Sequence, residues 1–139
     1  MTSRPRYIAF EGAEGCGKST QAAHFAERIG ALLTRETGGT AIGSRLREIL
    51  HDNDMVAMTH RTEALIAAAD RAQHIDEIVR PALASGAVVV SDRSVHSTLA
   101  YQGYGRELDV EELTRINDWA VGGLWPDLVV FIDTPDEVI

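Results

Sequence analysis

The sequence predicts an α/β three-layer sandwich with a mostly parallel sheet. Short apolar runs alternate with longer segments of helical periodicity along the whole chain, the pattern of strands joined by crossover helices. The segment 87–93 is an uninterrupted apolar run with a polar end, as expected of a central strand that is covered on both faces of a parallel sheet. The segment 127–133 predicts another buried strand. The 139 residues contain no repeat, low-complexity tract or linker, so we expect one domain over 1–139.

Each element follows from a local pattern. Strands are expected in four apolar runs: 7–10, 31–36, 87–93 and 127–133. The segment that starts at Lys18 carries apolar residues at helical spacing, and further helices are expected over 41–50, 59–83, 94–105 and 110–121. Pro81 should end or kink the long helix, and Gly86 should close that segment.

Composition excludes several classes of protein. The chain is 45% hydrophobic and 24% charged, which is ordinary for a globular domain with a buried core. No run reaches the roughly 18 to 20 apolar residues of a membrane helix, and the N-terminus has no signal-peptide pattern. The net charge of −8 argues against binding to nucleic acid. A single cysteine, Cys16, fits a reducing compartment. We therefore expect a cytoplasmic protein without a membrane partner.

The segment "GAEGCGKS" at 12–19 fits the P-loop pattern G-x-x-x-x-G-K-[ST], with a strand before it and a helix after it. Glycines let successive backbone N–H groups point at nucleotide phosphates, to which the helix N-terminus adds positive partial charge. Lys18 is expected to reach the β- and γ-phosphates, and Ser19 to ligate Mg²⁺. Cys16 is interpreted as a small loop residue without a catalytic duty. The phosphate-binding residues predicted here are Gly12, Gly15, Cys16, Gly17, Lys18, Ser19 and Thr20.

Asp92 and Arg93 follow the apolar run near residue 90. They are expected at the carboxyl end of a central strand, where open α/β sheets bind their ligands and where the P-loop also lies. A carboxylate there can hold the hydration shell of Mg²⁺, so the metal site is predicted at Ser19 and Asp92. An arginine there can stabilise a phosphoryl group in transit. A structural ion pair at the strand end is the alternative interpretation.

Four blocks of sequence resemble the bacterial thymidylate kinases in the same order: "FEGAEGCGKSTQ", "TRETGGT", "ALIAAADRAQH" and "DRSVHSTLAYQG", at 10–21, 34–40, 64–74 and 92–103. The resemblance implies a P-loop NTPase fold of the nucleoside monophosphate kinase type. It also implies transfer of a phosphoryl group from ATP to dTMP, giving dTDP, with Mg²⁺ as cofactor. The family is usually dimeric, so a homodimer is expected.

The same resemblance implies roles for individual residues. It gives a catalytic set of Lys18, Arg93, Asp92 and Glu14, in which Glu14 approaches the nucleoside 3′-hydroxyl. It places Glu36 near Mg²⁺ and the acceptor, Arg47 on the acceptor phosphate and Arg71 on the thymine ring. Ser97, Thr98, Tyr101 and Gln102 are implied on the helix that lines the same pocket. Tyr101 would crowd the sugar 2′ position or, alternatively, pack in the core, and Arg47 would bind phosphate or be merely exposed.

The chain departs from the family at three positions. Ala67 stands where the family often has a phenylalanine that stacks on the base. Either Ile66 supplies an aliphatic wall instead, or base affinity is weaker by about 0.5–1.5 kcal/mol. Thr37 replaces a proline beside Glu36, and Gly15 replaces an arginine of some members. In branches with that glycine, catalytic arginines come from a later lid, so residues 1–139 are expected to be incomplete at the C-terminus.

Other interpretations remain open. A kinase for another nucleoside monophosphate and an inactive nucleotide-binding subunit both fit the P-loop. A GTP-binding switch would need an N-K-x-D segment, which the sequence lacks. His74 is expected at a solvated position of the long helix in preference to one that faces the site. Trp119 and Trp125 are interpreted as packing residues, in a segment that would contribute to self-association.

Overall fold

The computed structural model describes residues 4, 6–13, 15–133 and 135, with the side chain of Tyr101 outside the description. This part of the chain contains a four-stranded sheet in the order β2-β3-β1-β4, in which every neighbouring pair is parallel. The strands are β1 (Tyr7–Gly12), β2 (Leu32–Arg35), β3 (Val89–Asp92) and β4 (Leu128–Ile132). The predicted parallel α/β sheet is confirmed, and β3 is a central strand as expected.

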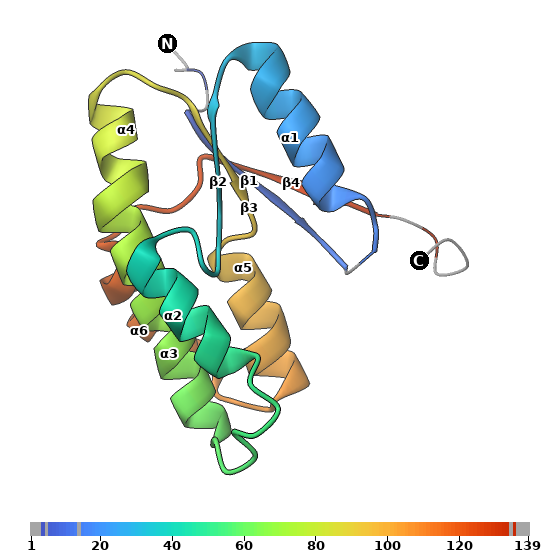
Figure 1. Cartoon of the computed structure of the whole chain (residues 1–139), viewed down its shortest axis with the longest axis vertical. Coiled ribbons are helices and arrows are strands. Elements are labelled where there is room, and N and C mark those ends of the chain that lie inside the picture. The colour runs from blue at the N-terminus through green and yellow to red at the C-terminus, as the bar shows by residue number, and fades with distance from the viewer. Residues whose placement is uncertain (1–3, 5, 14, 134, 136–139) are drawn as a thin grey trace.

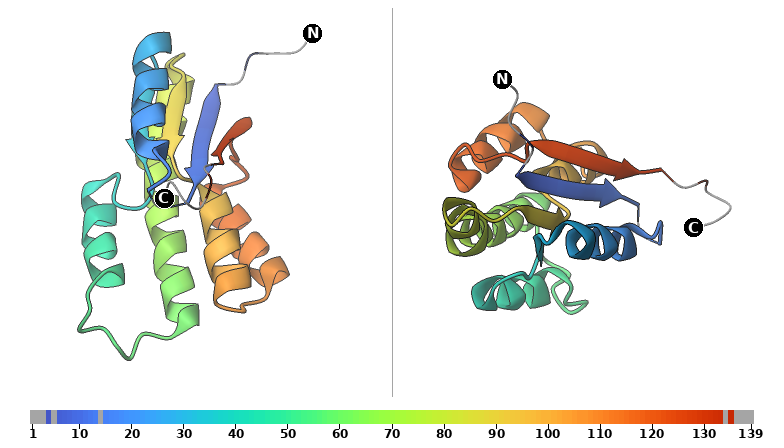
Figure 2. Two further views of the ribbon diagram at one scale, coloured as in Figure 1. Left: turned by 90° about the vertical axis from the view of Figure 1, so that its right-hand side faces the viewer. Right: turned by 90° about the horizontal axis from the view of Figure 1, so that it is seen from above.

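Helices cover both faces of the sheet (Figure 2, right). They are α1 (Lys18–Ile29), α2 (Ala41–Leu50), α3 (His60–His74), α4 (Arg80–Ala84), α5 (Val95–Thr98) and α6 (Val110–Val121), with π-helical segments η1 (Ile75–Val79) and η2 (Leu99–Gly105). On one face, Ile8 and Phe10 pack with Ala22 and Ala26 of α1. On the other, a second cluster contains Tyr7, Val89, Ile75, Val79 and Val121. These are the three predicted layers.

Strand β1 shows how one sequence supplies both clusters. Successive side chains of a strand point to opposite faces. Ile8 and Phe10 therefore face α1, while Tyr7 faces the opposite layer, and all three are buried. Glu11 belongs to the same face as Tyr7 and is also buried, at 6% exposure. The strand thus carries a carboxylate into the end of the sheet where the P-loop begins.

Pro81 was expected to end or kink the long helix, and the helix does not end there. The chain stays helical from α3 through η1 and α4, and this continuous helix ends with Ser85 as its C-cap. Proline lacks the N–H that an α-helix would use at this point. The preceding turn is π-helical, with the Arg80 N–H donating to the carbonyl of Ile75, five residues back. This wider turn lets the helix continue past a residue that donates no hydrogen bond.

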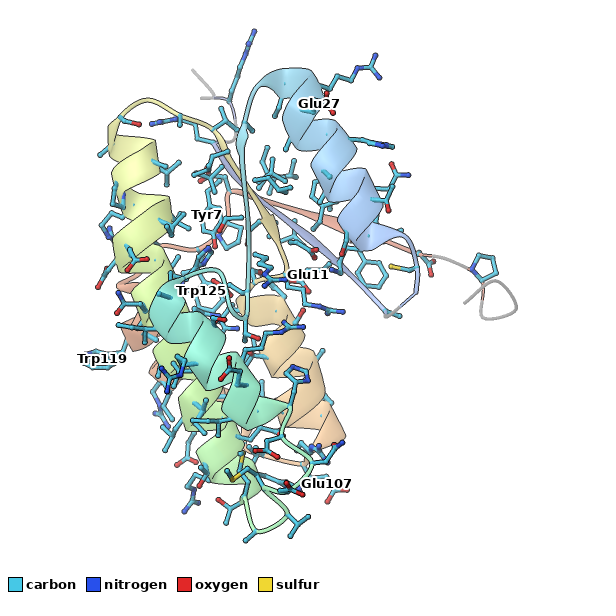
Figure 3. The ribbon with its side chains drawn as sticks, in the orientation of Figure 1. Tyr7, Glu11, Glu27, Glu107, Trp119 and Trp125 are labelled. Carbon is cyan, nitrogen blue, oxygen red and sulfur yellow. The ribbon has the colours of Figure 1, made fainter. Side chains whose placement is uncertain are left out.

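Two predictions of burial are wrong. Strand β4 was expected to be buried, but in the described chain it is an edge strand, and Phe131 is 67% exposed. Trp119, expected to pack, is 85% exposed and points away from the body of the protein (Figure 3). Trp125 does pack against the Tyr7 cluster, and its indole N–H donates to Asp118 at 2.7 Å. Apolar character alone did not distinguish these environments.

Helices α2, α3 and α5 lie side by side beyond the carboxyl ends of the strands (Figure 1; Figure 2, left). They form the far wall of the space into which the P-loop opens. Within the described residues no helix combines the length and apolar character that crossing a bilayer requires.

The cluster on the Tyr7 face gives a test of the core. Ile75 is fully buried there. We expect Ile75→Ala to lower the free energy of unfolding by about 2–5 kcal/mol, because the lost methyl groups leave a cavity. Ile29→Ala, at a position that is 44% exposed, is the matched control and should cost less than half as much. Urea denaturation measures both, and equal losses would contradict this description of the core.

Candidate active site

The P-loop turns sharply between β1 and α1. A Cβ at Gly12 would lie 2.8 Å from Cys16 Sγ and 2.9 Å from the Ile132 carbonyl oxygen, so only glycine fits there. Gly17, which precedes α1, has a left-handed backbone with φ +87°, a conformation that costs glycine little. These two requirements give the glycines of the motif a structural cause. They leave Lys18 at the first position of the helix.

Asp92 joins the P-loop to the neighbouring strand. Strands β1 and β3 pair in parallel with Phe10 opposite Asp92, so both chains leave the sheet at the same edge. Lys18 Nζ forms an ion pair with Asp92 Oδ1, and Ser19 Oγ donates to Oδ2 at 2.6 Å. Lys18 is only 7% exposed. The sequence-predicted lysine, hydroxyl and carboxylate therefore meet at one point.

Arg93 is held in an uncommon backbone conformation, with φ +73°. Its N–H donates to the Phe10 carbonyl at 2.9 Å, and its own carbonyl accepts from Ser91 Oγ at 2.7 Å. The guanidinium Nη1 donates to Ser97 Oγ at 3.1 Å. Left-handed backbone at a non-glycine residue costs energy and is concentrated at functional sites. Here it turns the chain from β3 into α5.

A cleft of about 1280 Å³ opens at this edge. Pockets for a single drug-sized ligand hold about 300–1,000 Å³, so this one has room for more than one small ligand. Its lining includes most of the predicted site residues: Gly12, Gly15, Gly17, Lys18, Ser19, Thr20, Glu36, Arg47, Ala67, Arg71, Asp92, Arg93, Ser97, Thr98 and Gln102.

Three predicted site residues are not placed in the cleft. Cys16 is described but does not line it, and its sulfur lies beside Gly12 instead. Its place in the phosphate-binding loop, as a small residue without a catalytic duty, therefore stays a prediction. Glu14 and the side chain of Tyr101 lie outside the described residues.

Arg71 is fixed at the far end of the cleft by three hydrogen bonds. Its Nε donates to Glu36 Oε1 at 2.8 Å, Nη1 to Asn117 Oδ1 at 2.6 Å and Nη2 to Thr98 Oγ1 at 2.8 Å. Its exposure is 3%. A guanidinium has five N–H groups, so two remain after these bonds. The arginine is thus oriented while part of its hydrogen-bonding capacity is kept.

His74 completes the support of Glu36 from behind. Its Nδ1 lies 2.8 Å from Glu36 Oε2, and its Nε2 lies 2.7 Å from Thr34 Oγ1. Because a carboxylate only accepts, Nδ1 carries the proton. The ring is fully buried, so the expectation of a solvated His74 was wrong. Helix α3 packs against both α2 and α6, and little of its circumference faces water.

Two buried carboxyls near this site have opposite pKa shifts. Burial favours the protonated form of Glu36, but the Arg71 guanidinium and His74 hold its pKa below the usual value. Burial also acts on Asp70 and raises its pKa, although the Gly38 N–H at 2.9 Å opposes this. The other Asp70 oxygen, Oδ2, has no hydrogen-bond partner among the described residues. Glu36 is therefore the stable anion of the pair.

Sequence reasoning missed Asn117 and Glu11. Asn117 is fully buried on the face of α6 that also carries Leu113 and Val121. A polar residue in that apolar stripe was the available signal, since residues four apart share a face. Glu11 is the charged residue that follows the apolar run 7–10 within β1, and it lines the cleft.

Comparison with known proteins agrees with this geometry. The family model described as thymidylate kinase matches residues 10–139. The chain belongs to the thymidylate kinase family. A thymidylate kinase of Nitratidesulfovibrio vulgaris is 49% identical, and the match covers 94% of this chain and 63% of that protein. One of Synechococcus sp. (strain JA-2-3B'a(2-13)) is 50% identical, with 95% and 66% covered. The chain therefore spans just under two thirds of these curated relatives.

A solved thymidylate kinase from Ehrlichia chaffeensis has the same fold, with a TM-score of 0.87 at 34% identity. The match covers 94% of this chain and 77% of that one. The resemblance to the thymidylate kinase family and the predicted fold class are confirmed.

Two departures from the thymidylate kinase pattern can now be described. Ala67 is buried and lines the cleft, whereas Ile66 is half-buried and does not. The alternative of an aliphatic wall from Ile66 is therefore wrong, and the wall at this point is a methyl group. The second departure is Thr37, which follows Glu36. Glu36 is nevertheless held by hydrogen bonds with Arg71 and His74, and the Glu36–Thr37 peptide bond is cis.

The buried Glu36 gives a pH-dependent test. Removing one partner of a buried ion pair costs about 3–5 kcal/mol, so we expect Glu36→Gln to lose about that much stability at pH 7. The pKa of Glu36 is lowered, so its stabilisation is present above the ordinary value of 4.5 and is lost as pH falls through the native value. The difference between the variant and the wild type should shrink in acid.

Denaturation from pH 3 to pH 7 measures this trend. Glu48→Gln is the matched control, because it removes a carboxylate from an ion pair that is exposed: Glu48 lies 3.9 Å from Arg45. Exposed ion pairs contribute about 0–1 kcal/mol to stability, so this variant should lose little. A loss for Glu36→Gln that is independent of pH would rule out the ion pair as its cause.

Proposed function

We propose that the protein transfers the γ-phosphoryl group of ATP to the 5′-phosphate of dTMP, giving dTDP and ADP. The observation that carries this proposal is a single cleft with two chemically distinct ends. At one end Asp92 meets Lys18 and Ser19 of the P-loop. At the other, Arg71 is fixed beside Thr98, where the resemblance to thymidylate kinases implies that the thymine base binds. The relatives named above are thymidylate kinases, which supports this choice of acceptor.

The proposed reaction needs positioning and charge neutralisation more than covalent chemistry. An oxygen of the dTMP phosphate attacks the γ-phosphorus, and the bond between that phosphorus and the β–γ bridging oxygen breaks. In this scheme the P-loop amides and Lys18 hold the donor phosphates. Arg93 and Arg47 lie on the cleft wall and hold the acceptor phosphate. Arg47 Nη1 already lies 3.3 Å from the Thr37 carbonyl oxygen, which orients it across the cleft.

The residues at the P-loop end fit Mg²⁺. Ser19 Oγ and Asp92 Oδ2 lie 2.6 Å apart, and Mg²⁺ prefers oxygen ligands while it keeps several waters and phosphate oxygens. We propose that these two residues hold the ion directly or through its waters. When bound, Mg²⁺ neutralises charge on the transferred phosphate. With Asp92 engaged by the ion, the ammonium of Lys18, which pairs with Asp92 in this structure, would be free to bind phosphate.

The acceptor end offers polar groups for a base. Among the described residues, the three hydrogen bonds of Arg71 leave two of its N–H groups unused, and the buried Gln102 Oε1 has no partner. An unmet buried polar atom costs free energy until a ligand satisfies it. The contacts of Glu14 with the sugar and of Tyr101 with the 2′ position remain proposals from the resemblance, as do the homodimer and the cytoplasmic location.

Ala67 favours one alternative, a kinase for another nucleoside monophosphate. A methyl group in the cleft wall leaves space where an aromatic ring would select a flat pyrimidine. A panel of dTMP, dUMP, dGMP and AMP with ATP and Mg²⁺ tests both possibilities. We expect dTMP to give the largest kcat/KM and Lys18→Ala to abolish transfer. Equal use of all four acceptors would overturn the assignment to dTMP, and full activity of Lys18→Ala would remove the P-loop from the mechanism.

The same assay should be run on residues 1–139 and on a chain extended to the length of the relatives. We propose that efficient transfer needs groups in the part of those proteins outside the match. Equal turnover by the two chains would contradict this proposal without affecting the assignment of the acceptor. An inactive nucleotide-binding subunit would give no transfer in either form.

Replacing Ala67 tests the shape of the base pocket. Ala67→Phe should add a ring to the cleft wall one turn from Arg71 and lower the dissociation constant of dTMP by about 2- to 10-fold, as one aromatic contact contributes about 0.5–1.5 kcal/mol. Calorimetric titration with dTMP measures it. Ala69→Phe, at an exposed position of the same helix, is the control. Weaker binding by Ala67→Phe would mean that the base does not lie against this wall.

A further inference from the structure

Glu11 is a buried carboxylate to which the reaction scheme above gives no role. It lies at the end of β1, one residue before the P-loop, and lines the cleft while being 6% exposed. Figure 3 shows it between the end of the sheet and the start of α5. Burying a carboxylate is costly unless hydrogen bonds compensate. Its partners therefore indicate what the carboxylate is for.

All the described partners of Glu11 lie at the start of the helix that follows Arg93. Oε1 accepts from the Ser94 backbone N–H at 2.6 Å and from Ser94 Oγ at 3.1 Å. Oε2 accepts from Ser97 Oγ. The carboxylate thus ties the end of β1 to the residue next to Arg93 and to the residue four further on.

The hydrogen bond between Ser97 and Arg93 has a fixed direction. A hydroxyl has one proton, and Ser97 donates it to Glu11, which can only accept. The Ser97 oxygen is then left to accept from Arg93 Nη1 at 3.1 Å. Two hydrogen bonds therefore connect Arg93 through Ser97 to Glu11, each with a fixed donor. This hydrogen-bonded series begins at a guanidinium in the cleft and ends at the buried carboxylate.

We propose that Glu11 is a positioning residue for phosphoryl transfer and that it acts through Ser97 on the guanidinium of Arg93. This inference rests on the proposed function. A small displacement of a group that stabilises the transition state can reduce the rate by about 100-fold. Arg93 is already held at its backbone by Phe10 and Ser91. Glu11 supplies the corresponding constraint on the side chain.

Glu11→Gln keeps the shape of the side chain but replaces one accepting oxygen with an NH₂ group that donates. The amide oxygen must take the Ser94 N–H, which leaves the NH₂ group facing Ser97. Ser97 then loses its acceptor, and its hydroxyl turns to another partner. We expect kcat to fall by about 10- to 100-fold, with KM for ATP changing by less than about threefold, since Glu11 touches none of the P-loop groups described above.

A double-mutant cycle with Arg93 separates positioning from a merely structural role. If Glu11 acts through Arg93, Glu11→Gln should change kcat by less than about threefold in an Arg93→Ala background, because residues that act as a unit are not additive. Losses that multiply fully in the double variant would overturn the proposal. Glu27→Gln is the matched control, on the exposed face of α1 far from this cluster (Figure 3), and it should leave kcat unchanged.

Ser97 supplies a second route if Glu11→Gln does not fold. Ser97→Ala removes the hydroxyl and should lower kcat, whereas Ser97→Thr keeps it and should restore kcat to within about threefold. Thermal unfolding midpoints measured alongside show which variants are folded. An Ala variant with normal kcat would refute the link through Ser97.

The proposal can also be judged if no monophosphate is phosphorylated by the wild type, a result that would defeat the proposed function alone. Crystal structures of the wild type and of Glu11→Gln then give the readout. An Arg93 guanidinium that leaves Ser97 in the variant supports positioning. One that stays in place overturns it.

Discussion

The parallel pairing of β1 with β3 is the constraint on which the site depends. It places Phe10 opposite Asp92, so the strand that enters the P-loop and the strand that enters the Asp-Arg pair end at the same level. Lys18 and Ser19 can then reach one carboxylate. A shift of one residue in register would turn the Asp92 side chain to the other face of the sheet. Apolar packing on both faces thus fixes polar geometry at the edge.

Buried carboxylates recur behind the arginines of this cleft. Glu36 holds Arg71 directly, and Glu11 reaches Arg93 through Ser97. A long arginine side chain loses considerable rotamer entropy when it is fixed. Partners that fix it before any ligand arrives remove that cost from the binding step, which is the physical content of preorganisation. Both arginines belong to helices or turns next to the sheet, where such partners are available.

Sequence patterns predicted the order of elements and the residues of the P-loop because both depend on local rules. Helical periodicity gave 41–50 and 110–121 with the bounds that the structure has. How deeply each residue is buried was harder to predict from the sequence. Helix α3 is rich in alanine, which gives little contrast between its faces, and the coverage of His74 by neighbouring helices is a tertiary property. The exposure of β4 likewise depends on which strands flank it.

The role of Glu11 illustrates what lies beyond such patterns. The alternating direction of side chains along a strand predicts only that residue 11 shares a face with Tyr7. A buried carboxylate at this position is stable only if hydrogen-bond donors surround it. These donors come from residues 94 and 97, more than 80 positions away. Local sequence contains no record of that pairing. The pairing arises because β3 lies next to β1 and because Arg93, with its left-handed backbone, turns the chain so that α5 begins over the end of the neighbouring strand.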